Sequence, residues 1–361
     1  MSSPDLSTTP QLVLITGASG FVGSATALLF LQKAHSVRLP MRKQEQVDGW
    51  MNGEHAKKYP GKIEAVLLEG GIEKEGVFDE MVKGCSAVVH TASPARLEFE
   101  DAETDILKPA LAGTLSILES CKKASSVKSF VYCSSVAAWT GTKNWRDPPE
   151  GFELNEKSWN DMTYEEAAKL PRDKGMDVYA ASKALAEKAA FKFVEQPDVH
   201  FTLSAIAPTV TLGYNPDPSL KTLKDGRSST GIMANMLWDK KDFDLSFAGI
   251  DFVPELYVSI TSVTLAHYHA ALNPSVSSGH RYLLAAKRTT LEDVVRVMVE
   301  CEPELKDHLP SVDGKGKLRG EYRFEAERVE KDFGFEYEPF ETFVAVYARQ
   351  LVQLAKAGGQ L

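Results

Sequence analysis

The chain has 361 residues, of which 43% are hydrophobic and 25% are charged, a balance typical of a folded globular protein and not of a disordered or fibrous one. Its formal net charge of −9 argues against a general affinity for nucleic acid or for an anionic membrane surface, because both attract clusters of Lys and Arg. The length is sufficient for one large domain with a smaller lobe.

Two features of the sequence bear on the cellular compartment. Residues 1–10 contain Asp5 and no basic cluster, so we expect a flexible N-terminus without a signal peptide, on a cytoplasmic protein. The four cysteines show no zinc-ligand spacing and no CxxC pair, and we expect them to be buried, reduced thiols. They are Cys85, Cys121, Cys133 and Cys301.

A glycine-rich run, TGASGFVG at residues 16–23, lies between a predicted strand at 12–15 and a predicted helix at 24–33. In this context Gly17 makes a tight turn, Gly20 lets the backbone approach a pyrophosphate, and Gly23 lets the helix pack closely on the strand. The free N–H groups at the start of the helix then stabilise the phosphates. The predicted cofactor contacts in this run are Thr16, Gly17, Ser19, Gly20, Phe21, Val22 and Gly23.

Strand-like and helix-like segments alternate after this run. Further strands are predicted at residues 37–41, 65–68, 87–91, 130–133 and 201–207, with helices at 102–123 and 178–194. This alternation predicts an α/β fold with a Rossmann-type, doubly wound parallel sheet. We expect residues 11–208 to form the cofactor domain and 209–361 to form mainly a substrate-binding lobe, with some segments returning to the first domain.

Residues 145–174 interrupt the alternation. They are rich in Pro, Glu, Asp and Asn with little periodicity, which is typical of an excursion that leaves the sheet. This segment, from Trp145 to Lys174, is a candidate for lining a substrate entrance.

Basic residues lie in and after the second predicted strand. Enzymes that bind NAD usually place an acidic residue there, about twenty residues after the glycine motif, to hold the ribose 2′-hydroxyl. This chain has Arg38, Arg42 and Lys43 instead. Because guanidinium and ammonium groups suit a 2′-phosphate, the sequence favours NADP(H), and a solvated basic turn is the alternative.

Four polar residues further along are candidates for carrying the chemistry. Tyr179 and Lys183 are four residues apart in a predicted helix, so they lie on one face. A lysine cation near a phenol favours the tyrosinate form, which makes the hydroxyl a usable general acid for a carbonyl oxygen. Ser134 and Ser135 follow the fifth predicted strand, at the edge where open α/β sheets bind their ligands.

The glycine run, the serine pair and YAASK at 179–183 occur in the order and nearly the spacing of the extended short-chain dehydrogenase/reductase family, which the chain resembles over most of its length. Within that family it is most similar to the group of plant dihydroflavonol and cinnamoyl-CoA reductases and fungal ketone and aldehyde reductases. The shared segments are FDEMVKGCSAVVHTASP, NEKSWN and FTLSAIAPTVTLG. In this group the chain looks most like the fungal NADPH-dependent carbonyl reductases.

The resemblance implies hydride transfer from NADPH to an aldehyde or ketone, reversibly, with Tyr179 as the proton donor. Lys183 would assist Tyr179 and bind the nicotinamide ribose, and Ser135, in preference to Ser134, would orient the carbonyl. Arg42, helped by Lys43 and by Arg38, would hold the 2′-phosphate. The further cofactor contacts that the resemblance implies are Thr91, Ala92, Ser93, Pro208, Thr209 and Val210.

The chain also departs from its relatives. Gly70 and Gly71 stand where relatives usually carry an aspartate that contacts adenine, and Thr140 aligns near the flavonoid-contacting asparagine of the plant enzymes, so a flavonoid substrate is not expected. The candidate substrate-pocket residues are Leu97, Ala137, Trp139, Tyr214 and Trp238.

Two other functions stay open at this stage. One is a 3-hydroxysteroid dehydrogenase or a sugar-nucleotide enzyme of the same family, and Arg42 and Lys43 argue against an NAD-retaining epimerase. The other is a regulator that binds NADP without catalysis, against which the complete Ser/Tyr/Lys set argues. We expect no metal, structural roles for His267 and His269, a small carbonyl or alcohol substrate, and a monomer or homodimer without nucleic-acid or membrane partners.

Overall fold

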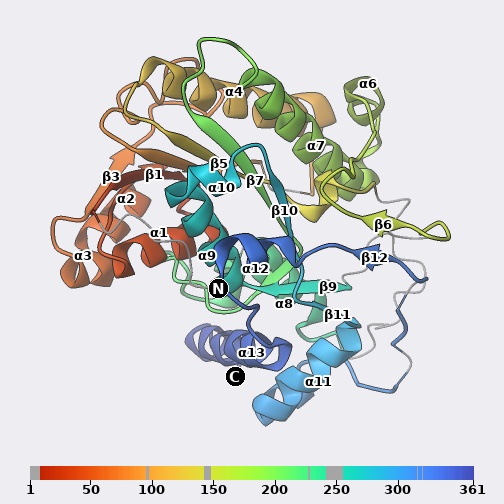
Figure 1. Ribbon diagram of the computed structural model, residues 1–361. Coiled ribbons are helices and arrows are strands. Elements are labelled where there is room, and N and C mark those ends of the chain that lie inside the picture. Colours follow the sequence, from red (N-terminus) through yellow and green to blue (C-terminus); the bar gives the residue numbers. More distant parts are fainter. Residues whose placement is uncertain are drawn as a thin grey trace.

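The computed structural model describes residues 9–94, 97–141, 148–226, 228–240, 255–314, 316–318 and 320–361. Its centre is a seven-stranded sheet with the order β10-β7-β5-β4-β1-β2-β3, in which every neighbouring pair is parallel (Figure 1). The strands are β1 (Leu12–Thr16), β2 (Ser36–Met41), β3 (Ile63–Leu67), β4 (Ala87–His90), β5 (Ser129–Cys133), β7 (Thr202–Pro208) and β10 (Arg281–Leu284).

The strand order reverses between β1 and β4, which makes this the topological switch point of a doubly wound fold. In the register Thr16 pairs with His90, and His90 pairs with Tyr132. The carboxyl ends of β1, β4 and β5 are therefore level with one another. In such sheets the ligand site lies outside these ends.

The sequence-based elements of the sheet are confirmed to within a few residues. All residues of β4 and β5 are buried, as expected of parallel strands that are covered on both faces. The first helix, α1 (Phe21–Gln32), begins three residues earlier than expected and so includes Gly23. Strand β10 was not predicted. Its four residues, RYLL, follow a loop and give too short a pattern to be recognised as a strand.

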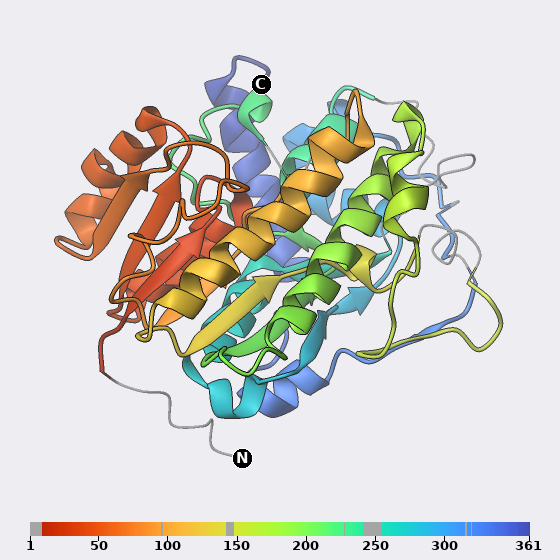
Figure 2. The same cartoon turned by 90° about the horizontal axis from the view of Figure 1, so that it is seen from above.

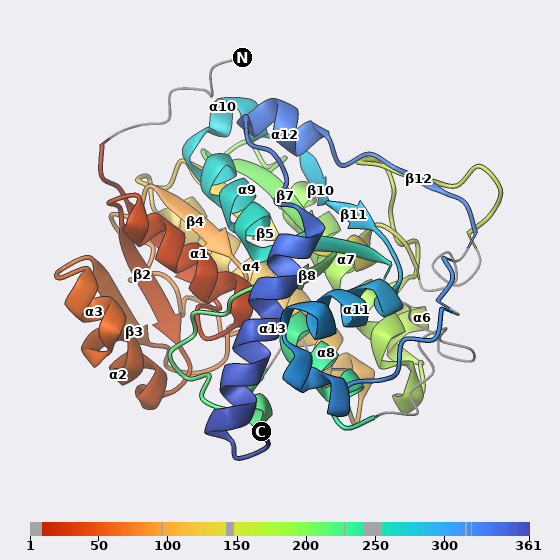
Figure 3. The same cartoon turned by 90° about the horizontal axis from the view of Figure 1, so that it is seen from below.

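Helices cover both faces of the sheet. Helices α4 (Lys108–Lys123) and α7 (Gly175–Phe193) lie side by side on one face (Figure 2), while α1 and α9 (Ile260–Leu272) pack together on the other (Figure 3). Helix α1 carries no charged side chain, which fits its burial between the sheet and α9.

The other α-helices are α2 (Gln44–Asn52), α3 (Glu54–Lys58), α6 (Tyr164–Ala168), α8 (Ser228–Leu237), α10 (Pro274–Ser277), α11 (Leu291–Cys301), α12 (Arg328–Phe333) and α13 (Phe340–Ala357). The short helical turns are η1 (Glu103–Leu107), η2 (Val136–Ala138), η3 (Arg172–Lys174), η4 (Leu223–Asp225) and η5 (Pro303–Asp307).

A smaller layer is built from the chain after Pro208. Strands β8 (Val210–Leu212), β9 (Leu256–Ser259) and β11 (Lys287–Arg288) form a three-stranded sheet, and α8, α11 and α13 enclose a second apolar core beside it (Figure 3). Between these elements the chain returns to the large sheet to supply α9 and β10. In the described residues, no helix is long and apolar enough to span a membrane.

Two smaller expectations have different outcomes. The thiols of Cys85, Cys121 and Cys133 are buried and free, but Cys301 is exposed because it ends α11 at the surface, so its predicted burial is wrong. His267 is fully buried and donates a hydrogen bond from Nδ1 to the Val263 carbonyl, which agrees with a structural role.

The predicted excursion has some secondary structure of its own. Trp145 and its neighbours at 142–147 lie outside the described residues. Beyond them, β6 (Glu153–Leu154) pairs in parallel with β12 (Arg323–Phe324), and α6 begins with a capping box between Thr163 and Glu166.

Candidate active site

A cavity of about 230 Å³ opens where β1, β4, β5 and β7 end. Its lining comes from the turn after β1, the segments after β4 and β5, helix α7, and the segment after β7. Most of the predicted site residues meet here. They are Gly17, Gly20, Phe21, Val22, Gly23, Thr91, Ser93, Ser135, Tyr179, Lys183, Pro208, Thr209 and Val210.

The glycine turn has the geometry of a phosphate loop. Gly17 has a φ of +74°, and a Cβ added at Gly23 would lie 2.3 Å from the Gly17 carbonyl oxygen, so a side chain there would push α1 away from β1. At Gly20 an added Cβ would meet only that same oxygen, at 3.4 Å, so its outer side borders open space. Gly20 caps α1 without a side-chain hydrogen bond, which leaves the first N–H groups of the helix available to an anion.

A buried hydrogen-bond network joins β1 to β4 beneath this turn. Thr91 Oγ1 donates to the Thr16 carbonyl at 2.7 Å, and the Ala92 N–H donates to Thr16 Oγ1 at 3.2 Å. The same hydroxyl lies 2.9 Å from Nδ1 of His90, whose pKa is lowered to about 3, chiefly by burial and further by the charge of Lys183. Thr16 and Ala92 therefore fasten the two strands and do not line the cavity, and neither does Ser19 in the turn.

Lys183 is held firmly at the floor of the cavity. Its side chain is buried, and Nζ donates a hydrogen bond of 2.9 Å to the Cys133 carbonyl at the end of β5. Nζ also lies 5.5 Å from the centre of the Tyr132 ring. Burial lowers the pKa of Lys183, but the negative charge that Tyr132, Tyr179, Cys133 and Glu187 can carry outweighs this effect and raises the pKa above its usual value. These surroundings therefore favour the charged form of Lys183.

The two serines after β5 have different surroundings. Ser135 caps the 3₁₀ turn η2, and its Oγ accepts a hydrogen bond from the Ala137 N–H at 3.2 Å, so its own proton is free to point to a ligand. The Ser134 hydroxyl is buried and donates to Glu187 Oε2 at 2.5 Å. This difference favours Ser135 over Ser134 as the group that meets a substrate.

Of the three residues predicted to bind the 2′-phosphate, Arg38 is engaged by other parts of the protein. Arg38 donates from Nε to Glu64 at 2.7 Å, and from Nη1 to the carbonyls of Met81 and Lys83 at 2.8 and 2.7 Å. Its guanidinium joins β2 to the neighbouring strand and to the turn before β4, so these contacts favour a structural role for Arg38 over the predicted binding of a 2′-phosphate.

Arg42 and Lys43 remain as candidates for that phosphate. Both are exposed, they follow directly on β2, and in the described part of the chain neither side chain has a hydrogen-bond or ionic partner. Helix α2 begins at the next residue, Gln44, without a side-chain cap. Two free cations and a free helix N-terminus therefore lie together at the carboxyl end of β2.

The outer wall of the cavity is apolar and rich in methionine. Leu97 and Ala137 line it as predicted, and the sequence analysis missed Val136, Met176, Thr211, Ser229, Ile232, Met233 and Met236. Ser229, Ile232, Met233 and Met236 share one face of α8 because they recur at intervals of three and four residues. That spacing is visible in the sequence, but it is equally typical of a helix that packs on a core.

The other three predicted pocket residues do not line this cavity. Trp139 is 1% exposed, in an apolar core. Tyr214 is half exposed beside a separate depression between α1, α9 and α13. Trp238 stacks on His308 with 4.8 Å between ring centres. Aromatic side chains supply much apolar area to cores, which sequence alone does not separate from a pocket. The described part of the excursion, 148–174, also contributes no residue to the cavity lining.

Comparisons with known proteins agree with this geometry. The chain is 34% identical to aldehyde reductase 2 of Sporidiobolus salmonicolor over 75% of its own length and 76% of that protein. It is 31% identical to ketoreductase azaE of Aspergillus niger over 95% and 98% of the two chains. Among solved structures it resembles yeast methylglyoxal/isovaleraldehyde reductase Gre2 in complex with NADPH, with a TM-score of 0.81, 27% identity, and coverage of 97% and 100%.

The matched family description is "NAD dependent epimerase/dehydratase family", over residues 13–222. This range contains the glycine turn, the serines after β5 and the Tyr/Lys pair of α7, which are the parts that meet at the cavity. The chain therefore belongs to the NAD-dependent epimerase/dehydratase family, the extended short-chain dehydrogenases/reductases.

Proposed function

We propose that this protein is an NADPH-dependent reductase that converts aldehydes or ketones to alcohols, reversibly. The observation that carries the proposal is the single cavity into which the phosphate turn, Ser135, Tyr179 and Lys183 all open. The relatives named aldehyde reductase and ketoreductase, and the Gre2 complex with NADPH, support it.

The residues present fit NADPH. The N–H groups at the start of α1 would bind the pyrophosphate, and Gly20 leaves room for its approach. Arg42 and Lys43 would bind the 2′-phosphate, with help from the free N–H groups at the start of α2. Lys183 would bind the nicotinamide ribose through the Nζ protons that the Cys133 carbonyl does not use. When bound, NADPH supplies the hydride.

The side chains around the carbonyl have complementary roles. Ser135 donates a hydrogen bond to the substrate oxygen, where negative charge develops during reduction. Tyr179 gives that oxygen its proton and is restored by solvent. The fixed positive charge of Lys183, on the same face of α7, stabilises the phenolate that Tyr179 briefly carries. In alcohol oxidation the same groups act in the opposite direction.

The lining also restricts the substrate. In the described residues, Lys183 is the only charged side chain at the cavity, and the apolar part of the lining includes Leu97, Met176, Ile232, Met233 and Met236. Burial of a carboxylate against such a wall without a partner is costly. We therefore propose neutral carbonyl compounds with apolar substituents as substrates, and expect esters of 2-oxo acids to be reduced in preference to the free acids.

Substitution Ile232→Arg tests the substrate proposal, because Ile232 is 41% exposed and lines the cavity. The new guanidinium should raise kcat/KM for the 2-oxo acid and lower it for the matched ester. Asn235→Arg on the exposed side of the same helix is the control. An unchanged acid-to-ester ratio in Ile232→Arg would contradict the assignment of this wall to the substrate.

The reaction itself is tested by loss of NADPH absorbance with a panel of aliphatic, aromatic and 2-oxo carbonyl compounds, beside NADH. Tyr179→Phe should lower kcat by about 10²- to 10⁴-fold, the usual contribution of general acid catalysis. The matched control is Tyr164→Phe, which removes a hydroxyl that bonds Glu103 away from the cavity. NADPH binding without turnover would favour a regulator, and a cofactor retained through purification together with sugar-nucleotide interconversion would favour an epimerase.

A further inference from the structure

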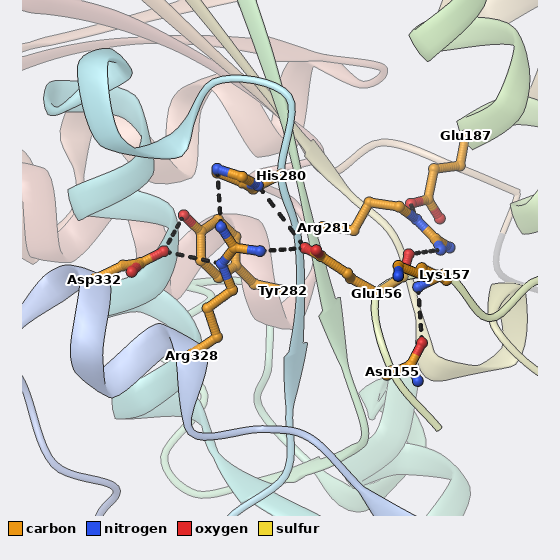
Figure 4. A network of polar contacts seen from close by, with 9 residues as sticks. All are labelled: Asn155, Glu156, Lys157, Glu187, His280, Arg281, Tyr282, Arg328 and Asp332. Atoms are coloured by element: carbon orange, nitrogen blue, oxygen red, sulfur yellow. Dashed lines mark hydrogen bonds and ion pairs between the residues drawn. The ribbon is translucent and has the colours of Figure 1, made fainter. Parts of the chain in front are cut away.

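A buried ion pair lies one helical turn below the catalytic lysine. Glu187 of α7 is fully buried, and its carboxylate accepts hydrogen bonds from Ser134 Oγ at 2.5 Å and from Arg281 Nε at 2.6 Å. Figure 4 shows Arg281 extending from β10 toward Glu187 on one side and toward the backbone at Glu156 on the other. Buried charges of this kind are costly unless they are paired, so their retention here calls for a role.

Arg281 is held through its Nε and Nη1 atoms, while its buried Nη2 has no hydrogen-bond partner among the described residues. Its Nη1 donates to the carbonyls of Glu156 and Ser158, both at 2.7 Å. Its guanidinium lies 3.4 Å from the centre of the Trp159 ring and 4.3 Å from that of Trp139. Trp139, which does not line the cavity, thus belongs to the support of this arginine.

A second group of ionic contacts holds the strand that carries Arg281. Arg328 of α12 donates from Nε to Asp332 at 3.1 Å and from Nη1 to Glu156 at 2.5 Å, and its Nη2 lies 2.9 Å from His280 Nε2 (Figure 4). Tyr282 donates to the same Asp332 at 3.0 Å. The start of β10 is therefore fastened to α12 and to the segment before α6, which limits the freedom of Arg281 to move.

Two contacts clamp α7 to the end of β5. Lys183 and Glu187 are four residues apart on one face of the helix, and they contact consecutive residues of the strand end. Lys183 Nζ bonds the Cys133 carbonyl, and the Glu187 carboxylate accepts from the Ser134 hydroxyl. The next residue is Ser135, whose hydroxyl faces the cavity. The clamp thus controls the position of the strand end that carries Ser135 relative to the helix that carries Tyr179.

We propose that Ser134, Glu187 and Arg281 form a positioning unit that holds Ser135 and Lys183 in register with Tyr179 for catalysis. Ser134 borders the cavity, but its hydroxyl is engaged by Glu187, and neither Glu187 nor Arg281 belongs to the lining. Arg281 neutralises and orients the Glu187 carboxylate, and Glu187 holds the Ser134 hydroxyl. Ser134 in turn fixes the backbone position of its two neighbours, Cys133 and Ser135. This inference rests on the proposed reductase function.

The decisive comparison uses two buried serines that each donate to a carboxylate. Ser134→Ala removes the bond to Glu187, whereas Ser120→Ala, in α4 and away from the cavity, removes a 2.6 Å bond to Asp79. Both variants should lose similar stability. Only Ser134→Ala should lower kcat, by about 10- to 100-fold, because small misplacements of catalytic groups are costly, while KM and the Kd of NADPH stay near wild type.

A second variant separates charge from hydrogen bonding. Glu187→Gln keeps an acceptor for Ser134 but leaves the Arg281 guanidinium without its counter-ion. It should lower stability and kcat, and Ser134→Ala/Glu187→Gln together should lose no more kcat than the larger single effect, since both act through one unit. Should Glu187→Gln not fold, the two serine variants decide the matter.

The outcomes are distinguishable. Equal kcat in Ser134→Ala and Ser120→Ala, beside an active wild type, would overturn the positioning unit and leave the proposed function intact. A wild type that reduces no carbonyl compound would overturn the proposed function. In that case crystal structures of wild type and Ser134→Ala still test the inference, because an unchanged position of Ser135 relative to α7 would refute it and a displaced one would support it.

Discussion

Replacement of Arg42 by alanine should change the cofactor preference without harming the fold. Arg42 is exposed, follows directly on β2, and has no ionic partner in the described structure, so its removal should alter the free energy of unfolding by no more than about 0.5 kcal/mol. A hydrogen bond to a charged group contributes about 1.5–3 kcal/mol. At about 1.4 kcal/mol for each factor of ten, kcat/KM for NADPH should fall about 10- to 150-fold.

The assay is the ratio of kcat/KM for NADPH to that for NADH, measured with one carbonyl substrate. The value for NADH should stay near wild type, because NADH has no 2′-phosphate. The ratio in wild type should also fall as salt is added, since the site is exposed and screened. An unchanged ratio in Arg42→Ala would refute the assignment.

Arg38→Ala is the matched control, four residues earlier. Its loss removes the bonds to Glu64 and to the carbonyls of Met81 and Lys83. We expect a loss of about 1–3 kcal/mol in stability, from the broken network, with an unchanged NADPH-to-NADH ratio. A changed ratio in this variant would contradict the structural role given to Arg38 here.

The remaining predictions concern stability. Gly23→Ala should destabilise the protein by about 1–3 kcal/mol and weaken NADPH binding, because its Cβ would lie 2.3 Å from the Gly17 oxygen and must displace α1; thermal unfolding and fluorescence titration check this. Stability should also fall as the pH drops below about 6.5. Burial lowers the pKa of His90 to about 3 and that of His267 to about 4, so the unfolded chain binds protons first. Each histidine should remove about 2 kcal/mol at pH 5, measured by chemical denaturation.

Each of these has a simple control. Gly49→Ala in α2 places a Cβ 3.7 Å from its nearest neighbour, an ordinary contact, and should not destabilise. Equal effects at the two glycines would refute the packing argument. His267→Gln should reduce the slope of stability against pH. A slope that His267→Gln leaves unaltered would show that this ring is not buried in its neutral form.

The sequence by itself determined the parts of the protein that depend on local pattern. The turn at Gly17, Gly20 and Gly23 is a strand–turn–helix signal within eight residues, and the structure has that turn at the edge of the cavity. Apolar runs without polar alternation predicted strands buried on both faces. The spacing of Tyr179 and Lys183 sufficed to place both on one helical face.

The tertiary structure determines which of several side chains of one type makes structural contacts and which stays available to a ligand. Arg38 and Arg42 look equivalent in the sequence, but only the sheet brings Glu64 and two carbonyls to Arg38. The pairing of Glu187 with Arg281 joins residues 94 positions apart, and no local pattern indicates it. Periodicity reports which face of an element is apolar, but what covers that face, a core or a substrate, depends on chain segments distant in sequence, so only the folded molecule separates them.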